Sequence, residues 1–306
     1  MGGNVVINGM SARRIEVETL EQLVDLNHEV AILMHRLQME PGSYFPTGSY
    51  RAMLENFSRV HHSKPTLGDV DIAVHKDSKG HIMSMLPKLE AIDAIAGWKV
   101  SGSNIIVLTN TGEQIDLELT DGSAWSLWIR QSDIADLDCG IKGFANIFLF
   151  RALTSLTVKD FPGLGEMNEY AFSLNGLRRK VEMNGAVAEV IPSSKVKPND
   201  YITDPGTILQ ILLADRCFQP VSKIIPSDVW EVSSSFVKLW AFVCSWIKSK
   251  SDLDKISNAL YDLLYSDKAQ SLYRDDPERD AQEKDAIWKE FQRTLMMNKA
   301  SVAYED

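Results

Sequence analysis

Residues 65–74 decide the fold and read Pro65-Thr66-Leu67-Gly68-Asp69-Val70-Asp71-Ile72-Ala73-Val74. Because side chains alternate along a strand, the apolar Val70, Ile72 and Val74 share one face. Asp69 and Asp71 share the other. Two carboxylates held close together over an apolar face are costly unless a positive charge lies between them. Hard oxygen ligands suit Mg²⁺ or Mn²⁺, so this stretch predicts a strand that carries part of a divalent-metal site.

A second strand offers a third carboxylate. Residues 100–108 and 114–120 are both predicted as strands, joined by a hairpin turn at 109–112. Asp116 and Glu118 face one way along the second of them, and its apolar residues face the other. If this strand lies beside 67–75 with its apolar face on the same core, either Asp116 or Glu118 meets the first two carboxylates.

The turn Gly48-Ser49 adds a phosphate-binding element to this metal site. A glycine turn that opens a helix offers backbone N–H groups and a hydroxyl to phosphate oxygens. Three carboxylates can hold two metal ions roughly 3.5–4 Å apart, and such a pair supports an in-line phosphoryl displacement. Together these segments predict metal-dependent phosphoryl transfer.

Helices surround the predicted sheet. Apolar spacing predicts helices near 17–38, 50–60, 82–96 and 143–156, short strands near 170–174 and 186–191, and then helices at 226–248, 252–265 and 277–297, with a helix start at Asp204-Pro205. This order predicts an α+β fold with a small mixed sheet, followed by a helical C-terminal region. We divide the chain into an N-terminal helical segment (1–40), a catalytic core (41–125), a nucleotide- and substrate-binding region (126–222) and a helical C-terminal domain (223–306).

Composition excludes several classes. The chain has 306 residues and a formal net charge of −10, so an overall positive field for binding nucleic acid is excluded, and such binding would need a local basic patch or bridging metal ions. No apolar stretch is long enough to span a bilayer, and the N-terminus lacks the features of a signal peptide. Cys139, Cys217 and Cys244 are scattered, which is typical of a reducing, cytoplasmic compartment. We expect no membrane partner.

Several motifs, taken in order, resemble the nucleotidyltransferase superfamily typified by DNA polymerase beta, and most closely the DNA polymerase X family. The Gly-Ser turn and the two strands carry the likeness to the superfamily. Further segments similar to the polymerase X family extend it over about residues 44–222: Thr47-Gly48-Ser49-Tyr50-Arg51, Lys64 to Asp71, Met167-Asn168-Glu169-Tyr170, Ile202 to Leu209, and Gln219-Pro220.

The resemblance implies a polymerase-beta-like core and transfer of a nucleoside monophosphate from an NTP or dNTP to an acceptor hydroxyl, with release of pyrophosphate. It implies two Mg²⁺ (or Mn²⁺) ions, with Asp69 and Asp71 ligating both and Asp116 ligating one and helping to activate the hydroxyl. A nucleic-acid 3′ end is the acceptor it implies. The residues it assigns to nucleotide binding are Gly48, Ser49, Arg51, Lys64, Gly68, Phe144 and Asn146.

The chain also departs from the family. Residues 52–63 look like an insertion, and the basic run after the Gly-Ser turn is reduced to Arg51, with Arg59 and Lys64 as substitutes. The acceptor could therefore instead be a tRNA end, a protein side chain or a small molecule. A third alternative is a non-catalytic binding protein on the same fold. Three adjacent carboxylates argue against it, because they would repel one another without metal.

Overall fold

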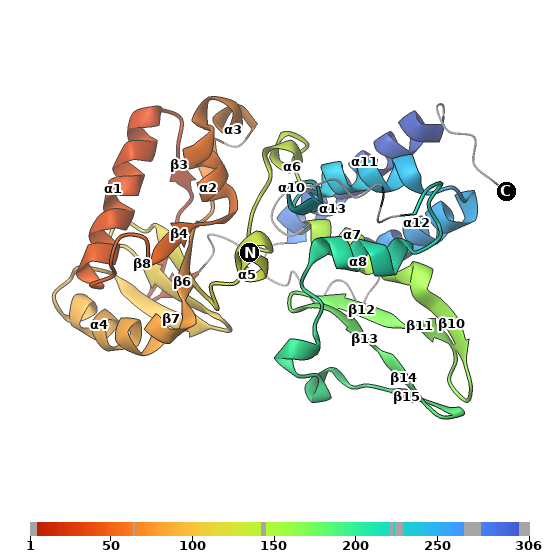
Figure 1. Ribbon diagram of the computed structural model, residues 1–306. Coiled ribbons are helices and arrows are strands. Elements are labelled where there is room, and N and C mark those ends of the chain that lie inside the picture. The colour runs from red at the N-terminus through yellow and green to blue at the C-terminus, as the bar shows by residue number, and fades with distance from the viewer. Residues whose placement is uncertain are drawn as a thin grey trace. The chain divides into compact units, whose positions relative to one another are not determined.

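The chain divides into two compact units, residues 1–143 and 144–306. The structure is a computed structural model, and it describes residues 5–63, 65–141, 145–220, 223, 229–265 and 277–299. Figure 1 shows helices and strands in both units, so the expected α+β class is confirmed. Segments 1–40 and 41–125 of the expected division lie in the first unit and 223–306 lies in the second, while 126–222 extends across the boundary.

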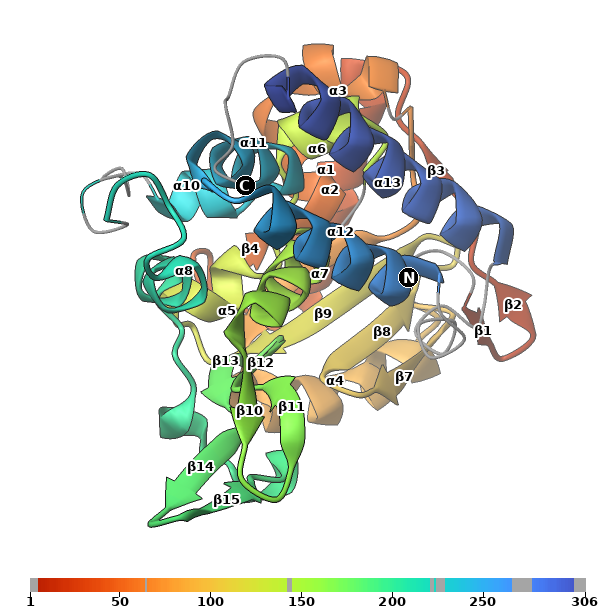
Figure 2. The same ribbon diagram turned by 90° about the vertical axis from the view of Figure 1, so that its right-hand side faces the viewer.

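A five-stranded mixed sheet organises the first unit. Its order is β4-β6-β9-β8-β7, and β8, β9 and β7 can be followed in Figure 2. β6 and β9 are parallel, and the other neighbouring pairs are antiparallel. The strands are β4 (Tyr44–Pro46), β6 (Val70–His75), β7 (Gly97–Ser101), β8 (Asn104–Leu108) and β9 (Gln114–Thr120).

One face of this sheet is the apolar core. The alternating residues predicted to face inward are buried there, including Val70 and Ile72 of β6 and Ile115 and Leu117 of β9. Helices α1 (Leu20–Arg36), α2 (Gly48–Glu55) and α4 (Lys79–Ala91) contribute side chains to the same core. Burial of this face fixes the register, because a one-residue slip would turn every apolar side chain outward.

The opposite face carries polar side chains over its centre. Gln114, Asp116 and Glu118 follow one another along β9, and Asp71 of β6 pairs in register with Asp116. Next to them, Ile106 and Leu108 of β8 form a small apolar cluster with Ile7 of the N-terminal strand β1 (Val6–Ile7) and with Val5 just before it. The carboxylates therefore share their face with a covered apolar patch.

The start and the buried face of helix α1 follow directly from its sequence. Thr19 precedes it, and its hydroxyl accepts a hydrogen bond from the Gln22 amide at 3.2 Å. The Gln22 side chain accepts from the Thr19 amide in return, which completes a capping box. Leu23, Leu26 and Val30 then lie on the buried stripe. The helix expected at 17–38 thus begins and ends within the predicted range.

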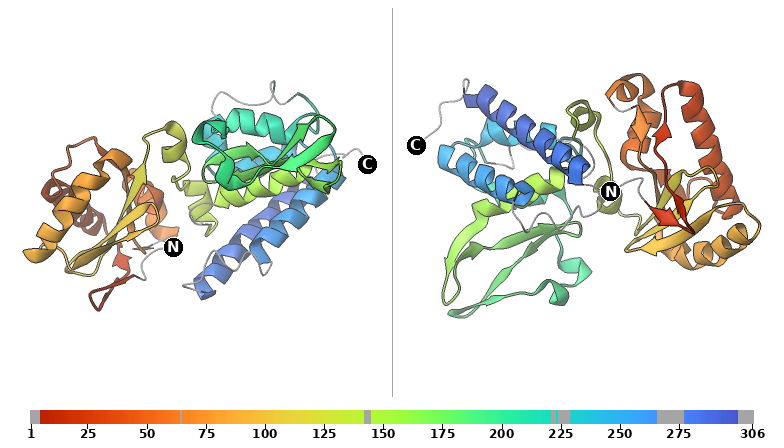
Figure 3. Two further views of the ribbon diagram at one scale, coloured as in Figure 1. Left: turned by 90° about the horizontal axis from the view of Figure 1, so that it is seen from below. Right: turned by 180° about the vertical axis from the view of Figure 1, so that it is seen from behind.

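The second unit combines three β-hairpins with helices (Figures 1 and 3). Glu169 lies between the hairpins, and its carboxylate pairs with Lys159 at 2.5 Å and with Arg179 at 2.9 Å. The hairpins are β10 (Val158–Phe161) with β11 (Gly165–Asn168), β12 (Tyr170–Ser173) with β13 (Gly176–Arg179), and β14 (Val181–Asn184) with β15 (Val187–Val190). The helices are α7 (Ala145–Leu153), α8 (Pro205–Leu213), α10 (Val229–Ser233), α11 (Phe236–Trp246), α12 (Lys250–Tyr265) and α13 (Pro277–Lys299).

Several expected elements are wrong in extent. The single strand expected at 100–108 is two strands, because Gly102 with a φ of +60° makes a turn between β7 and β8. The helix expected near 50–60 is interrupted at Asn56, where α2 ends and α3 (Phe57–Ser63) begins. The described part of the helix expected at 226–248 is also divided, since Ser235 caps a new helix, α11.

The helix expected at 82–96 is displaced toward the N-terminus. It is α4, which ends at Ala91, and residues 92–96 turn back toward β7. In the part of the chain that the structure describes, no helix is both long enough and apolar enough to cross a membrane.

We expect the β6–β9 core to dominate the stability of the first unit. Leu117 is fully buried in β9, so Leu117→Ala should lower the free energy of unfolding by about 2–5 kcal/mol. The matched change Leu20→Ala removes a side chain that is 59% exposed, and it should change stability by no more than about 0.5 kcal/mol. Urea unfolding of both variants checks this, and similar losses for the two would contradict the assignment of the core.

Candidate metal and phosphate site

Three carboxylates meet on the polar face of the sheet. One oxygen each from Asp69, Asp71 and Asp116 lies within 4.8 Å of the others. Asp116 is 5% exposed and Asp69 is 9% exposed, so the group is largely withdrawn from water. This spacing is comparable with the width of one coordination shell around a divalent cation. It is the arrangement that the alternating pattern of the two strands predicted, and Asp116 rather than Glu118 completes the group.

The parallel pairing of β6 with β9 places these side chains. Asp71 lies directly opposite Asp116, and Glu118 lies opposite Ala73, one pair further along. Asp69 precedes β6 and lies two residues before Asp71, so it projects to the same face. Strand register therefore brings together residues that are 45 positions apart in the sequence (Asp71 and Asp116).

Burial and mutual repulsion disfavour the charged forms of these groups. Burial, together with the charge of Asp69, raises the pKa of Asp116 to about 7. The pKa of Asp71 is also raised well above its ordinary value, first by burial and then by Asp69, Glu118 and Asp116. Removing two like charges from water next to each other has this effect, and a bound cation would reverse it.

Gln114 holds the Asp116 carboxylate. Its side-chain Nε2 donates to Asp116 Oδ1 at 2.8 Å, and this bond opposes the rise in the pKa of Asp116. The two residues lie two apart on β9 and therefore share a face. The other amide atom, Gln114 Oε1, is buried and has no hydrogen-bond partner among the described residues. A polar atom buried in this way is typical of a site that gains a ligand or water.

The turn at Gly48 lies directly against the carboxylates. Gly48 has a φ of +57°, in the left-handed region that favours glycine. A Cβ at this position would overlap Asp71 Oδ2. The turn is held from both sides, because the Thr47 amide donates to the Asp71 carbonyl at 2.9 Å and the Gly48 amide donates to the Arg130 carbonyl at 2.9 Å. Only glycine allows the start of α2 to approach Asp71 this closely.

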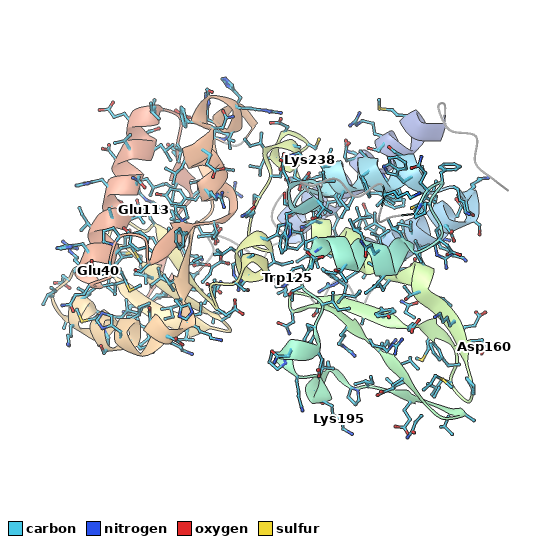
Figure 4. All side chains as sticks on the ribbon, in the orientation of Figure 1. Glu40, Glu113, Trp125, Asp160, Lys195 and Lys238 are labelled. Atoms are coloured by element: carbon cyan, nitrogen blue, oxygen red, sulfur yellow. The ribbon has the colours of Figure 1, made fainter. Side chains whose placement is uncertain are left out.

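Glu118 has partners of its own. Its Oε2 accepts a hydrogen bond from the Thr47 hydroxyl at 2.8 Å and lies 3.5 Å from Nε of Arg130. Burial raises the pKa of Glu118, while Arg130 and Thr47 oppose that rise. Arg130 follows α5 (Ala124–Trp128), whose Trp125 is labelled in Figure 4, and it also donates to the Ser126 carbonyl at 2.6 Å. Glu118 is thus joined to the glycine turn and to Arg130.

The other residues assigned to nucleotide binding have varied positions. Ser49 is buried in the first turn of α2, and Gly68 lies just before Asp69. Arg51 is paired with Glu55 at 2.6 Å, and Arg59, its expected substitute, is paired with Asp138. Asn146 belongs to the second unit, where its side chain donates to the Ser233 carbonyl at 3.2 Å. Lys64 and Phe144 lie outside the described residues.

Sequence reasoning missed three residues that surround the carboxylates: Thr47, Gln114 and Arg130. The alternation along β9 could have indicated Gln114, because it shares a face with Asp116. Nothing in the sequence marks Arg130, since a long-range contact brings it to the turn. Comparison of the chain with protein-family models and with curated proteins gives no match.

We expect alanine at Gly48 to be far more damaging than alanine at a glycine of similar conformation. Gly102 has a φ of +60° and open space where a Cβ would lie, so Gly102→Ala should cost about 1–2 kcal/mol of unfolding free energy. Gly48→Ala has the same backbone cost and also overlaps Asp71, which should add at least about 1 kcal/mol. Urea unfolding of both variants measures the difference, and equal losses would mean that the turn does not lie against Asp71.

Stability without metal should depend on pH through Asp116. The pKa of Asp116 is raised from 3.8 to about 7 in the folded protein, so the protonated carboxyl favours the folded state. This stabilisation is complete below about pH 4 and is lost as the pH rises through 7. Asp116→Asn should therefore raise the unfolding free energy at pH 8 by an amount on the order of a few kcal/mol, and flatten its fall between pH 5 and pH 8. Urea unfolding in EDTA tests this. Asp25→Asn on the exposed face of α1 is the control, and an Asp116→Asn profile parallel to wild type would refute the prediction.

Proposed function

We propose that the first unit is the catalytic core of a metal-dependent nucleotidyltransferase of the polymerase-beta type. The observation that carries this proposal is the largely buried group of Asp69, Asp71 and Asp116 with the glycine turn of α2 against it. Carboxylates at this spacing serve a divalent cation, and a glycine turn at a helix start serves a phosphate. The two together suit a substrate that carries both, such as a metal–nucleoside triphosphate.

The residues present fit Mg²⁺ or Mn²⁺. Among the described residues, this group holds oxygen ligands alone, with no histidine or cysteine in it. Hard oxygen donors favour Mg²⁺ or Mn²⁺ over zinc, which prefers nitrogen and sulfur. Asp69, Asp71 and Asp116 would hold the ions, as the resemblance to the polymerase X family implies. Bound ions would lower the pKa of the attacking hydroxyl and neutralise charge on the phosphates.

The reaction exchanges a phosphoanhydride bond for a phosphoester bond. The acceptor oxygen forms a bond to the α-phosphorus, and the bond from that phosphorus to the bridging oxygen of pyrophosphate breaks. The protein's own residues would position the substrate and supply a proton acceptor. The Gly48-Ser49 turn would orient the phosphates, and a carboxylate such as Asp116 would take the proton from the acceptor hydroxyl.

Two considerations favour different acceptors. The resemblance to the polymerase X family favours a nucleic-acid 3′ end. Charge favours a different acceptor, because the chain carries −10 and both Arg51 and Arg59 are already paired with carboxylates. This consideration favours a protein side chain or a small molecule, and together with a tRNA end these acceptors form the second candidate. A non-catalytic role on the same fold would leave the cost of burying these carboxylates without a purpose.

Nucleotide transfer tests the proposal. Each α-labelled NTP and dNTP is incubated with the protein, Mg²⁺ or Mn²⁺, and either a primed template, RNA, protein or a small-molecule extract. We expect label to move to one acceptor class, and the variants Asp69→Asn, Asp71→Asn and Asp116→Asn to lower the rate about 10²–10³-fold or more, because each removes charge stabilisation at the reacting phosphate.

Asp25→Asn removes an exposed carboxylate of α1 and is the matched control, with an expected rate equal to wild type. Template-directed extension would identify a polymerase, and label on another acceptor would identify the second candidate. No transfer to any acceptor, together with cation binding that survives Asp69→Asn, would refute both enzymatic functions.

A further inference from the structure

A short hairpin, residues 5–13 (the strap), lies on the polar face of the sheet without being part of it (Figure 2). Among the described strands, β1 and β2 (Met10–Ser11) pair with each other and with no strand of the sheet. Within the described residues, a single backbone hydrogen bond joins the strap to the rest of the unit, from the Arg13 amide to the Gly112 carbonyl at 2.9 Å. Side chains must therefore supply most of its attachment.

Apolar side chains of the strap and of β8 form one small cluster. Its buried members are Val5, Ile7, Ile106 and Leu108. Ile7 fits closely against the start of β7, because a Cβ at Gly97 would lie 2.6 Å from Ile7 Cγ2. Val6 faces the other way and is 57% exposed. A two-stranded hairpin on a cluster of this size belongs to the least stable part of a domain, where local opening is easiest.

Polar contacts fix the tip and the end of the strap. At the tip, Asn8 Nδ2 donates to Glu90 Oε1 at 2.7 Å and to the Ala96 carbonyl at 3.1 Å. At the end, the Arg13 guanidinium pairs with Glu113. Asn8 and Arg13 are both exposed, so water competes for these bonds. The contacts orient the strap and add little to its stability.

The side chains that the strap covers lie beside the carboxylate group. Ile106 is directly opposite Asp116 on the neighbouring strand, and Leu108 is directly opposite Gln114. Opposed residues of antiparallel strands share a face, with Cβ atoms about 4.5–5.5 Å apart. Docking of the strap over Ile106 and Leu108 therefore helps to withdraw Asp116 and Gln114 from water. It is accompanied by a buried carboxylate and by the unpartnered Oε1 of Gln114.

Burying a carboxylate is costly unless a cation accompanies it. The negative charge of Asp116 therefore opposes docking of the strap, and a bound cation removes that opposition. We infer that the strap is a metal-responsive cover, which docks on β8 more firmly when the carboxylate group holds a cation and opens more readily when it holds none. The inference rests on the proposed function, which supplies the cation. Because such coupling is reciprocal, docking strengthens cation binding by the same factor.

Amide hydrogen exchange measures docking without any turnover. The Arg13 amide is the reporter, because its bond to the Gly112 carbonyl joins the strap to the β8–β9 turn. Its exchange is followed by NMR at pH 8, above the raised pKa of Asp116, with and without Mg²⁺. We expect saturating Mg²⁺ to slow the exchange at least about fivefold in wild type. Asp116→Asn should slow it to a similar extent without metal, because the variant removes the buried charge.

The reciprocal measurement is the Mg²⁺ affinity of variants with weakened docking, determined by calorimetry. Ile7→Ser places a hydroxyl in the apolar cluster and should bind Mg²⁺ at least about fivefold more weakly than wild type. Val6→Ser makes the same change on the exposed face of β1 and is the matched control, with an affinity within about twofold of wild type. If Ile7→Ser does not fold, Asn8→Gly serves in its place, because it keeps the turn and removes the bonds to Glu90 and Ala96.

Two results would overturn the inference while leaving the proposed function intact. One is an Arg13 exchange rate that Mg²⁺ leaves unchanged or raises in a protein that binds the ion. The other is an equal Mg²⁺ affinity of Ile7→Ser and Val6→Ser. A wild-type protein that binds no Mg²⁺ would overturn the proposed function and the metal-responsive cover together.

Discussion

The parallel pairing of β6 with β9 is the constraint on which the rest of the first unit depends. This pairing sets Asp71 directly opposite Asp116 and forces several carboxylates into one largely buried space. The pairing is itself held by the apolar face beneath, where Ile72 and Leu117 are fully buried, so the sheet cannot relieve the repulsion by slipping. Hydrophobic burial on one side of the sheet thus sustains an electrostatically unfavourable arrangement on the other, as is common where a site binds cations.

The surroundings of the carboxylates are organised to hold this arrangement. Gln114 bonds to Asp116, and Arg130 lies against Glu118, so two of the acids have a neighbour that stabilises the charged form. Asp71 instead lies against the glycine turn. The backbone at Gly48 approaches the Asp71 carboxylate so closely that the Cβ of any other residue type would overlap it. The turn, the strand pair and Arg130 are joined by hydrogen bonds, and the proposed chemistry depends on this connected arrangement.

Alternation of apolar and polar residues made the sheet predictable, because burial of one face selects that pattern directly. The elements whose extent was predicted wrongly have another explanation. Gly102 turns the chain within an apolar run, and Ser235 starts a new helix inside a helical pattern, so a single residue overrides a favourable periodicity. The strands predicted near 170–174 and 186–191 are confirmed by β12 and β15, but the other strands of these hairpins were not predicted. Short strands such as β10 carry exposed charges, and the hairpins are held partly by Glu169, whose partners Lys159 and Arg179 lie on two different strands.

The sequence by itself determined that Asp69 and Asp71 share a face of one strand, that Asp116 and Glu118 share a face of another, and that a glycine turn precedes them. Each of these follows from local geometry, since side-chain direction along a strand depends only on residue number. Only the tertiary structure decided that Asp116 joins the first two carboxylates, that Glu118 engages Thr47 and Arg130, and that Arg59 is paired with Asp138. The reason is physical: which polar groups meet depends on strand register and on loop paths across many residues, and the buried core sets both.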